Sequence, residues 1–338
     1  MTTLSTYESF DEKSKHFNLV KVETIDDYNK IVTTQQMLNG IYRGINNSKY
    51  KIYTSLQRQI ILKDLQYKFR IEDYLNNFRQ NKILEKYFDT FKIEASKLSI
   101  YSYLQHYRAP TPFLDFTTNF EKALYFAIEN FEETSNVEQG LIDDYFSIFF
   151  INQTDFDLIE IPEVIRSLKP LKRLSNDLFS QYEDYTHQHL VSHIDNIFTI
   201  NTCNVFLISH YEEFIDIYNT YNNIRIVAQE GLFIHNDYLD KPLEEALKEF
   251  FKEATIFVGS ALDEIDDPQI IANNEKYRED LEKNRGFQQR LEKNIITSFE
   301  IKKSLICEIR KSFSLQKGDI YPDPEKLCRQ IFKDSLPK

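Results

Sequence analysis

The segment from residue 105 to residue 119 concentrates side chains that can hold a ligand. It runs Gln-His-Tyr-Arg-Ala-Pro-Thr-Pro-Phe-Leu-Asp-Phe-Thr-Thr-Asn and leads into a helical pattern that starts at Phe120. The first turn of a helix offers unpaired N–H groups and a partial positive charge, and Thr117 and Thr118 stand just before it. This arrangement predicts a phosphate or ribose site. The alternative is a capped helix after a stiff loop, with Asp115 accepting from backbone donors.

Arg43 is a second candidate, because it stands in Tyr42-Arg43-Gly44 within a short stretch that is predicted to be a strand. An arginine among apolar neighbours is costly to bury unless an anion or a carboxylate meets it. The planar guanidinium group suits phosphate. The alternative role for Arg43 is a structural ion pair.

A third candidate is the pair Gln229 and Glu230, which precedes Gly231 in an apolar stretch. We predict a strand over residues 224–235, in which the two side chains point to opposite faces, so that one of them faces a site. The alternative is an exposed glutamate beside a bulge at Gly231.

The sequence lacks the motifs that are typical of several enzyme classes. None of the seven glycines forms a G-x-G pair, so a dinucleotide fingerprint and a P-loop are both missing. His187, His189 and His193 have ligand-like spacing but no H-E-x-x-H pattern, which favours a solvated helix face. No G-x-S-x-G elbow is present. The three cysteines are far apart, which argues against a cysteine-based metal site and for a reducing compartment.

The composition limits the partners. The chain has 338 residues and a formal net charge of −12, which argues against a sequence-blind nucleic-acid binder but allows one local basic pocket. A nuclease-like effector is disfavoured for the same reason, although Lys169, Lys172 and Arg173 could form a small basic patch. The longest apolar run, near residues 145–151, is far shorter than the roughly 20 residues that cross a bilayer. We therefore expect a soluble, cytoplasmic protein without a membrane contact.

Hydrophobic patterning predicts one α+β domain with helical elaborations. Residues 1–17 are polar and are expected to form a loose lead-in, and the highly charged residues 263–293 are expected to form a solvated helix pair or an insertion. The expected strands are 40–44, 145–152, 204–210, 224–235, 254–259 and 297–301. The expected helices begin near residue 24, fill 56–107 and 120–131, and return at 172–194 and 242–253.

Taken in order, these segments resemble the FRG domain, a family named for its Phe/Tyr-Arg-Gly signature. The resemblance covers roughly residues 24–335, which implies an FRG domain over 18–338 after the lead-in. Arg108 stands where the family usually has glycine, and Pro112 and Phe113 replace its common Arg-Leu. The matching segments are Tyr42-Arg43-Gly44, Tyr53–Arg58, Gln105–Asn119, Ala123–Ala127, Arg225–Phe233 and Gly318–Asp323.

The order of these parts is also similar, more weakly, to that in ADP-ribosyltransferases. That resemblance implies an ADP-ribosyltransferase-like mixed sheet core and NAD-dependent ADP-ribosyl transfer or NAD cleavage, with NAD as the substrate and no metal. Arg43 would then hold the NAD phosphates, Thr117 and Thr118 would shape the nicotinamide-ribose pocket, and Glu230 or Gln229 would stand at the catalytic position. The remaining residues expected at the NAD site are Gly44, Gln105, His106, Thr111 and Tyr125.

The FRG resemblance also implies a cellular role, since the family often accompanies phage-defence and toxin-like proteins. We therefore expect a toxin or anti-phage defence effector with an antitoxin or a phage-derived activator, and the macromolecular acceptor stays open. The alternative is a non-catalytic module that senses a ligand through the same pocket.

Overall fold

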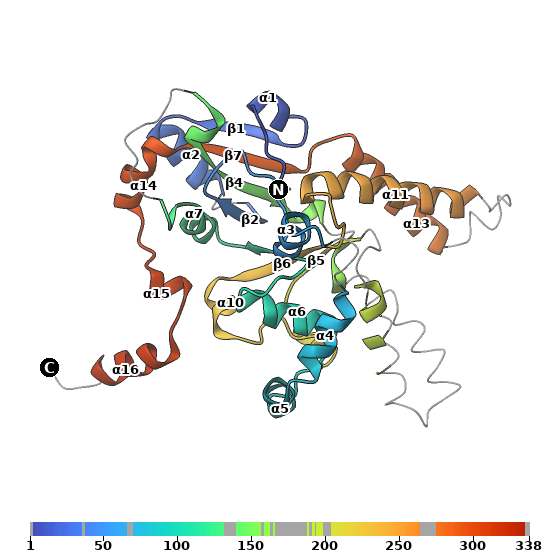
Figure 1. The fold of residues 1–338 in the computed structure, drawn as a ribbon. Helices are drawn as coiled ribbons and strands as arrows, with labels where there is room; N and C mark the ends of the chain where they lie inside the picture. The colour runs from blue at the N-terminus through green and yellow to red at the C-terminus, as the bar shows by residue number, and fades with distance from the viewer. Residues whose placement is uncertain are drawn as a thin grey trace.

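A mixed β-sheet forms the centre of the computed structural model of this chain (Figure 1). The structure describes residues 3–35, 38–65, 70–131, 140–156, 159–162, 165, 188, 191–192, 194–198, 204–263 and 275–334. Within these residues, seven strands pair in the order β1-β7-β4-β2-β3-β6-β5. All neighbours are antiparallel except β1 and β7. The strands are β1 (Asn18–Val22), β2 (Gly40–Ile45), β3 (Phe113–Thr117), β4 (Tyr145–Asn152), β5 (Val205–Ile208), β6 (Gly231–Asn236) and β7 (Ile296–Lys302).

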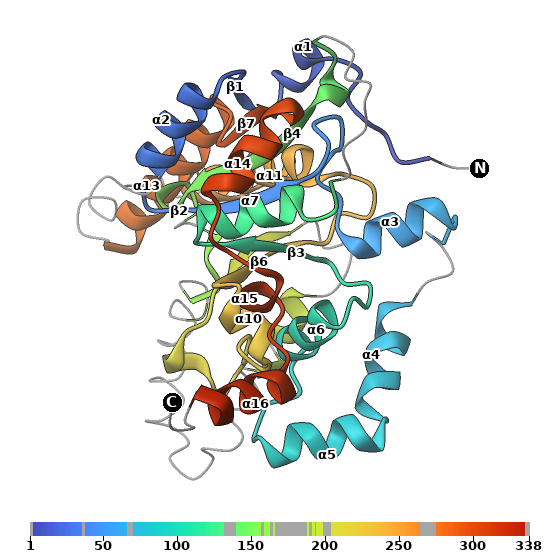
Figure 2. The ribbon, with the colours of Figure 1, turned by 90° about the vertical axis from the view of Figure 1, so that its left-hand side faces the viewer.

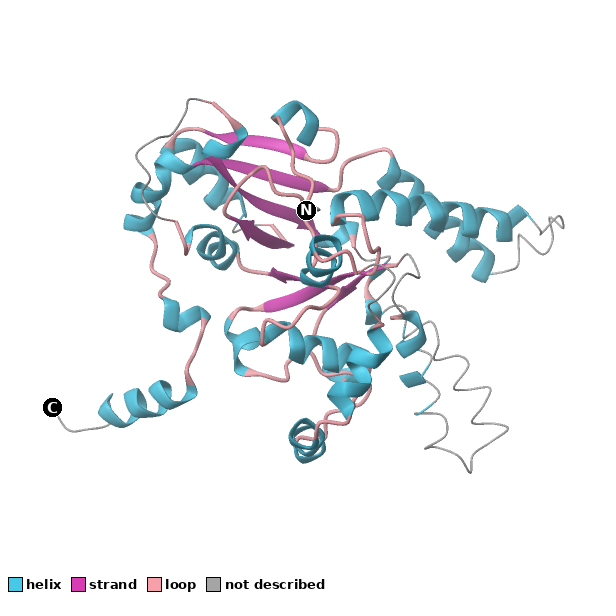
Figure 3. Ribbon diagram, in the orientation of Figure 1, coloured by secondary structure: helices cyan, strands magenta, loops and turns pink. Residues whose placement is uncertain are grey.

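Helices cover both faces of this sheet (Figures 1 and 3). The described α-helices of the chain, including those that lie away from the sheet, are α1 (Phe10–Lys13), α2 (Ile25–Gln35), α3 (Ser55–Leu62), α4 (Ile71–Arg79), α5 (Lys82–Thr90), α6 (Lys97–His106), α7 (Phe120–Ile128), α10 (Ile224–Ala228), α11 (Leu243–Asp263), α13 (Glu275–Leu291), α14 (Ile306–Ser312), α15 (Lys317–Ile320) and α16 (Pro324–Asp334). The described residues are therefore α+β, as expected.

The core has two parts, one on each face of the sheet, because β4 is buried on both sides. Phe146 of β4 packs with Leu124 of α7 and Ile306 of α14 in the smaller cluster. Phe149 of β4 packs in the larger cluster, to which α3, α6 and α11 also contribute. Successive strand residues point to opposite faces, so an almost continuously apolar strand is the expected pattern for this position.

The sheet is nearly divided between β2 and β3. β2 pairs with β4 over all six of its residues, but it pairs with β3 only at Tyr42 and Thr117. The strand order places β1, β7, β4 and β2 on one side of this point and β3, β6 and β5 on the other, and Figure 3 shows the two groups of strands apart. The two strands therefore leave a gap next to Arg43 and Asp115.

Gly44 allows α7 to lie directly on β2. A Cβ atom at Gly44 would stand 1.9 Å from the carbonyl oxygen of Ala123 and 3.0 Å from the Cβ of Ala127. No side chain fits at that separation, so the glycine of the Tyr-Arg-Gly segment is required by the contact between helix and strand.

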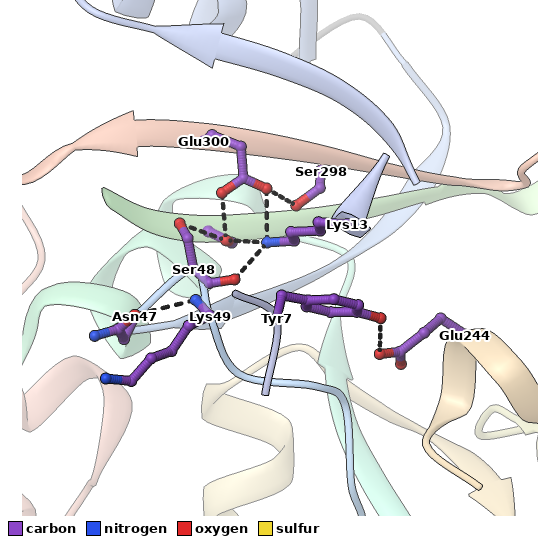
Figure 4. A network of polar contacts seen from close by, with 9 residues as sticks. Tyr7, Lys13, Asn47, Ser48, Lys49, Glu244, Ser298 and Glu300 are labelled. Atoms are coloured by element: carbon purple, nitrogen blue, oxygen red, sulfur yellow. Dashed lines mark hydrogen bonds and ion pairs between the residues drawn. The ribbon is translucent and has the colours of Figure 1, made fainter. Parts of the chain in front are cut away.

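A fully buried ion pair ties the N-terminal segment to the sheet (Figure 4). Lys13 Nζ lies 2.7 Å from Glu300 Oε1 and also donates to Ser147 Oγ at 2.8 Å and to the Ser48 carbonyl at 2.9 Å. Ser298 Oγ donates to Glu300 at 2.6 Å. Because each charge is met by hydrogen bonds and neither side chain is exposed, this cluster fixes α1 against β4 and β7 and takes no ligand.

Residues 3–17, expected to be a loose lead-in, therefore lie packed against the domain. Tyr7 and Phe17 are 1% exposed and belong to the larger core cluster. The polar composition did not reveal this packing, because the apolar side chains are few and widely spaced; Tyr7 and Phe17 are buried, whereas Leu4 and Phe10 are partly buried.

The expected strands at 40–44, 145–152, 204–210 and 297–301 are confirmed as β2, β4, β5 and β7. The strand expected over 224–235 is wrong in its first half, which is α10. Asn223 begins that helix, because its Oδ1 accepts from the N–H groups of Arg225 and Ile226. The strand expected at 254–259 is also wrong, since those residues lie inside the long amphipathic α11.

Where it is described, the charged stretch 263–293 contains one helix, α13, which packs on the preceding α11, and not a helix pair of its own. α11 and α13 pack side by side, and the ring of Phe251 lies 6.0 Å from that of Phe287. The residues between the two helices lie outside the described part of the chain, as do the three spaced histidines, the basic patch at 169–173 and most of the helix expected at 172–194. No described helix combines the length and the apolarity needed to cross a membrane.

We predict that Gly44→Ala lowers the free energy of unfolding by at least about 2 kcal/mol, because the added methyl group cannot fit against the Ala123 carbonyl. Urea denaturation measures the change. Gly318→Ala is the matched control, since a Cβ there meets nothing within 4 Å, and it should leave stability within about 0.5 kcal/mol of the original. Equal effects of the two substitutions would contradict the close packing.

Glu244 makes stability depend on pH. It is 2% exposed, accepts from Tyr7 Oη at 2.6 Å and lies 3.3 Å from the Ile52 N–H. Burial raises the pKa of Glu244 from 4.5 to about 7, and the neighbouring Glu245 adds to the rise while the hydrogen bonds oppose it. The folded state therefore holds a proton that the unfolded chain releases near pH 4.5.

The free energy of unfolding should thus fall as pH rises from about 4.5 to about 7, with a contribution of up to about 3 kcal/mol from this group. In Glu244→Gln this contribution should vanish. Chemical denaturation of both proteins between pH 4.5 and pH 8 isolates it as a difference. Parallel pH profiles would show that Glu244 titrates normally.

Candidate functional site

A cavity of about 440 Å³ opens where β2 and β3 separate. Its walls come from β2, β3, α3, the ends of α6 and α7, α10 with the turn after it, and the C-terminal segment. The lining residues are Tyr42, Arg43, Gly44, Arg58, Gln105, His106, Arg108, Asp115, Phe116, Thr117, Phe126, Glu129, Asn130, Arg225, Gln229 and Tyr321.

Positive charge is concentrated in this cavity. Four arginines line it, and only two carboxylates, those of Asp115 and Glu129, stand among the lining residues. The chain as a whole carries a net charge of −12. Such a local excess inside an acidic protein is the electrostatic signature of an anion site.

Arg43 spans the gap between the two parts of the sheet. Its Nη1 donates to the Asp115 carbonyl at 2.6 Å, while its Nε is enclosed and has no partner among the described residues. Burial lowers the pKa of Arg43 to about 10; Asp115 opposes this shift and the neighbouring Arg58 adds to it. The guanidinium stays protonated at neutral pH, and its charge is not neutralised by a direct ion pair in the described structure.

Arg58 also lines the cavity and lies on α3, a helix that begins with a capping box. Thr54 Oγ1 accepts from the N–H of Gln57, and Gln57 Oε1 accepts from the N–H of Thr54. No hydrogen bond or ion pair holds the Arg58 side chain within the described structure, and surrounding protein lowers its pKa while Asp115 raises it. Its side chain is therefore free to meet a ligand.

A chain of hydrogen bonds positions Asp115. Gln105 Nε2 donates to Asp115 Oδ2 at 2.7 Å, and Thr111 Oγ1 donates to Gln105 Oε1. Thr111 is fully buried, and its N–H donates to Ser55 Oγ at 3.0 Å. Thr111 thus lies behind the cavity wall and orients Gln105, which in turn orients the carboxylate.

His106 is neutral in this site. It is 8% exposed, and burial lowers its pKa to about 4, with Arg225 acting in the same direction and Asp115 against it. Its carbonyl accepts from Arg225 Nη1 at 3.2 Å. His106 therefore places an arginine at the cavity rather than adding a charge of its own.

Gln229 and Glu230 diverge at the turn between α10 and β6. Gln229 lines the cavity, and its Nε2 donates to the Ile320 carbonyl at 3.2 Å. Glu230 has a φ of +47° and lies outside the lining, where Lys122 Nζ donates to its Oε1 at 2.7 Å. The side chains of Gln229 and Glu230 thus point apart, as expected, but they do so in a turn and not in a regular strand.

Thr117 is the only member of its threonine pair that lines the cavity. Its Oγ1 donates to the Gln229 carbonyl at 2.7 Å, whereas Thr118 is exposed and donates its N–H to the Glu230 carbonyl. Asn119 Oδ1 accepts from the N–H groups of Glu121 and Lys122, so α7 has the expected cap. Asp115 accepts from the Gln105 side chain and not from backbone donors as the alternative expected. Tyr125 also stays outside the lining, against Phe313.

The C-terminal segment closes one side of the cavity. Tyr321 Oη lies 3.1 Å from Glu129 Oε2, and the Ile320 carbonyl accepts from Gln229. Figure 2 shows α14, α15 and α16 running past α7 and α10. Tyr321 and Arg58 were not singled out as site residues from the sequence, although both lie in segments that resemble the FRG domain.

Comparison with protein families identifies one part of the chain. The family model of the FRG domain matches residues 39–136, so this part of the chain is an FRG domain. The match contains β2 and β3 with Arg43, Arg58, Gln105 and Asp115, whereas Gln229 lies beyond it. No curated protein and no solved structure matches the chain.

A metal centre has no support in the described part of the chain, where no three histidine, cysteine, aspartate or glutamate side chains gather in a group that could hold an ion.

Asp115→Asn should raise the affinity of the cavity for inorganic pyrophosphate about fivefold, because it removes a negative charge that acts on both Arg43 and Arg58. An asparagine oxygen can still accept from Gln105, so the fold should persist. Calorimetry measures Kd, and Asp89→Asn on the exposed side of α5 serves as the charge-matched control with no change. An unchanged or weaker affinity in Asp115→Asn would show that this carboxylate does not oppose anion binding.

Proposed function

We propose that this chain binds NAD in the arginine-lined cavity and breaks the bond between nicotinamide and ribose. The ADP-ribosyl group passes to water or to a macromolecular acceptor. The observation that carries the proposal is the meeting of four arginines with one oriented carboxylate in a cavity large enough for a small-molecule ligand. Arginine pairs with phosphate oxygens through two parallel hydrogen bonds, which suits a diphosphate.

The proposed step balances without a further reactant. The C1′–N bond breaks, and nicotinamide leaves as a neutral molecule with the electron pair of that bond. Water or an acceptor nucleophile then forms the new bond at C1′ and releases its proton. Positive charge develops on the ribose during this step, and a nearby carboxylate stabilises it electrostatically.

Glu129 also lines the cavity, but it accepts from Tyr321 Oη at its edge, which leaves two carboxylates as candidates for that role. Asp115 lines the cavity, and Gln105 holds one of its oxygens. Glu230 stands one residue from the lining Gln229 and is paired with Lys122. We assign the role to Asp115, because it already faces the cavity and needs no rearrangement.

A second candidate function is a non-catalytic ligand-sensing module. It is favoured by the Glu230–Lys122 ion pair, which holds the expected catalytic glutamate away from the cavity. Either activity would suit a toxin or an anti-phage defence effector, and we propose that cellular role on the strength of the FRG resemblance alone.

The test is incubation of the purified protein with NAD labelled on the adenylate phosphate, in buffer and in cell lysate. We expect release of nicotinamide, or label on a macromolecule. Asp115→Asn should lower turnover at least 100-fold while the protein still binds NAD, because the carboxylate acts mainly on the charge of the transition state.

Glu230→Gln is the paired variant and should retain at least a third of the activity. The opposite pattern would move the catalytic role to Glu230. Binding of NAD without turnover in any condition would favour the sensing module, and the absence of both binding and turnover would exclude NAD as the ligand.

A further inference from the structure

A second cavity of about 500 Å³ adjoins the first. It lies between the N-terminal residues, the loop before α3 and the end of β2, and it shares four lining residues with the first cavity. These shared residues are Arg43, Gly44, Arg58 and Phe126. The two cavities therefore meet at the two arginines that stand closest to the gap in the sheet.

The second cavity differs from the first in chemistry. Aromatic rings supply much of its wall, from Tyr50, Tyr53 and Phe126. Lys51 adds the single charged side chain that is not shared, and it is paired with Glu245 at 2.9 Å. This cavity thus offers flat apolar surfaces together with the hydroxyl groups of Ser5 and Thr6 and the side-chain amide of Asn46, which are groups that can receive a nucleoside base.

The junction between the two cavities holds two guanidinium groups whose charges no ion pair neutralises in the described structure. The enclosed Arg43 Nε has no described partner, and Arg58 makes no hydrogen bond or ion pair with the described residues. Asp115 is the one carboxylate that acts on both guanidinium groups, and it already accepts from Gln105. A ligand that places two negative charges at this point would satisfy both arginines.

We infer that the two cavities are the halves of one dinucleotide site. The diphosphate lies between Arg43 and Arg58, the adenosine half occupies the aromatic cavity against Tyr50, and the nicotinamide riboside half lies beside Asp115 and Gln229. This inference rests on the proposed function and assigns its subsites. It makes Arg58 a second phosphate ligand and Tyr50 the surface on which the adenine stacks.

The experiment measures the two halves of the ligand separately, with ADP and nicotinamide mononucleotide as calorimetric probes. Tyr50→Ala should weaken ADP binding at least fivefold, as expected for the loss of one stacked base, and change nicotinamide mononucleotide binding less than twofold. Gln229→Ala should do the reverse. Arg58→Gln should weaken both probes about tenfold, since each presents phosphate to the junction.

Controls separate these effects from a general loss of structure. Tyr50→Phe keeps the ring and should keep the ADP affinity within twofold. Phe91→Ala removes an exposed aromatic side chain outside both cavities and should affect neither probe. Tyr50 is 44% exposed, and circular dichroism of each variant verifies that it folds.

The outcomes also distinguish this inference from the proposed function. If Tyr50→Ala weakens both probes equally or neither of them, the division into halves is overturned, even if NAD is cleaved. If the two halves respond as expected but NAD is not cleaved, the division stands for a nucleoside-diphosphate ligand and the proposed reaction is wrong.

Discussion

The separation of β2 from β3 beyond the pair Tyr42–Thr117 is the constraint on which the site depends. Past that pair the ladder hydrogen bonds are missing, and Arg43 partly replaces them by donating across the gap to the Asp115 carbonyl. On the other side of β2, Gly44 brings α7 into direct contact with the strand. The segment Tyr42-Arg43-Gly44 therefore contains the last residue paired with β3, the arginine that donates across the gap, and the glycine on which α7 packs.

The energetic cost of this arrangement is electrostatic. Enclosing an arginine in a cavity removes part of its hydration, and the lowered pKa of Arg43 reflects that burial. Arg58 is more exposed, and the surrounding protein also lowers its pKa. Asp115 compensates in part, and Gln105 and Thr111 hold it where it acts on both guanidinium groups. The remaining imbalance is a reason to expect a bound anion. By contrast, both charges of the buried Lys13–Glu300 pair are met by each other and by hydrogen bonds from neighbouring serines and a carbonyl group.

Local patterns predicted most of the elements that carry the site. The glycine-bounded segment at 40–44 and the stiff loop before α7 both lie where the sequence places them, and Arg43, Gln105, His106 and Thr117 meet in one cavity. The apolar run after Asn223 was misassigned as a strand, because a short apolar run is compatible with either structure and the side-chain cap was not weighed. The run at 254–259 lies in a helix that begins eleven residues earlier.

By itself, the sequence determined the α+β class, the FRG segment and the residue types able to bind an anion, because these follow from local periodicity and from a continuous motif. The tertiary structure alone decided which of those side chains share a cavity. It brings Arg58 of α3 beside Arg43 and pairs Glu230 with Lys122. It also adds Tyr321, which lies far along the chain from the other lining residues, to the cavity wall. Such meetings depend on how strands diverge and helices pack over long sequence separations, and no local pattern encodes them.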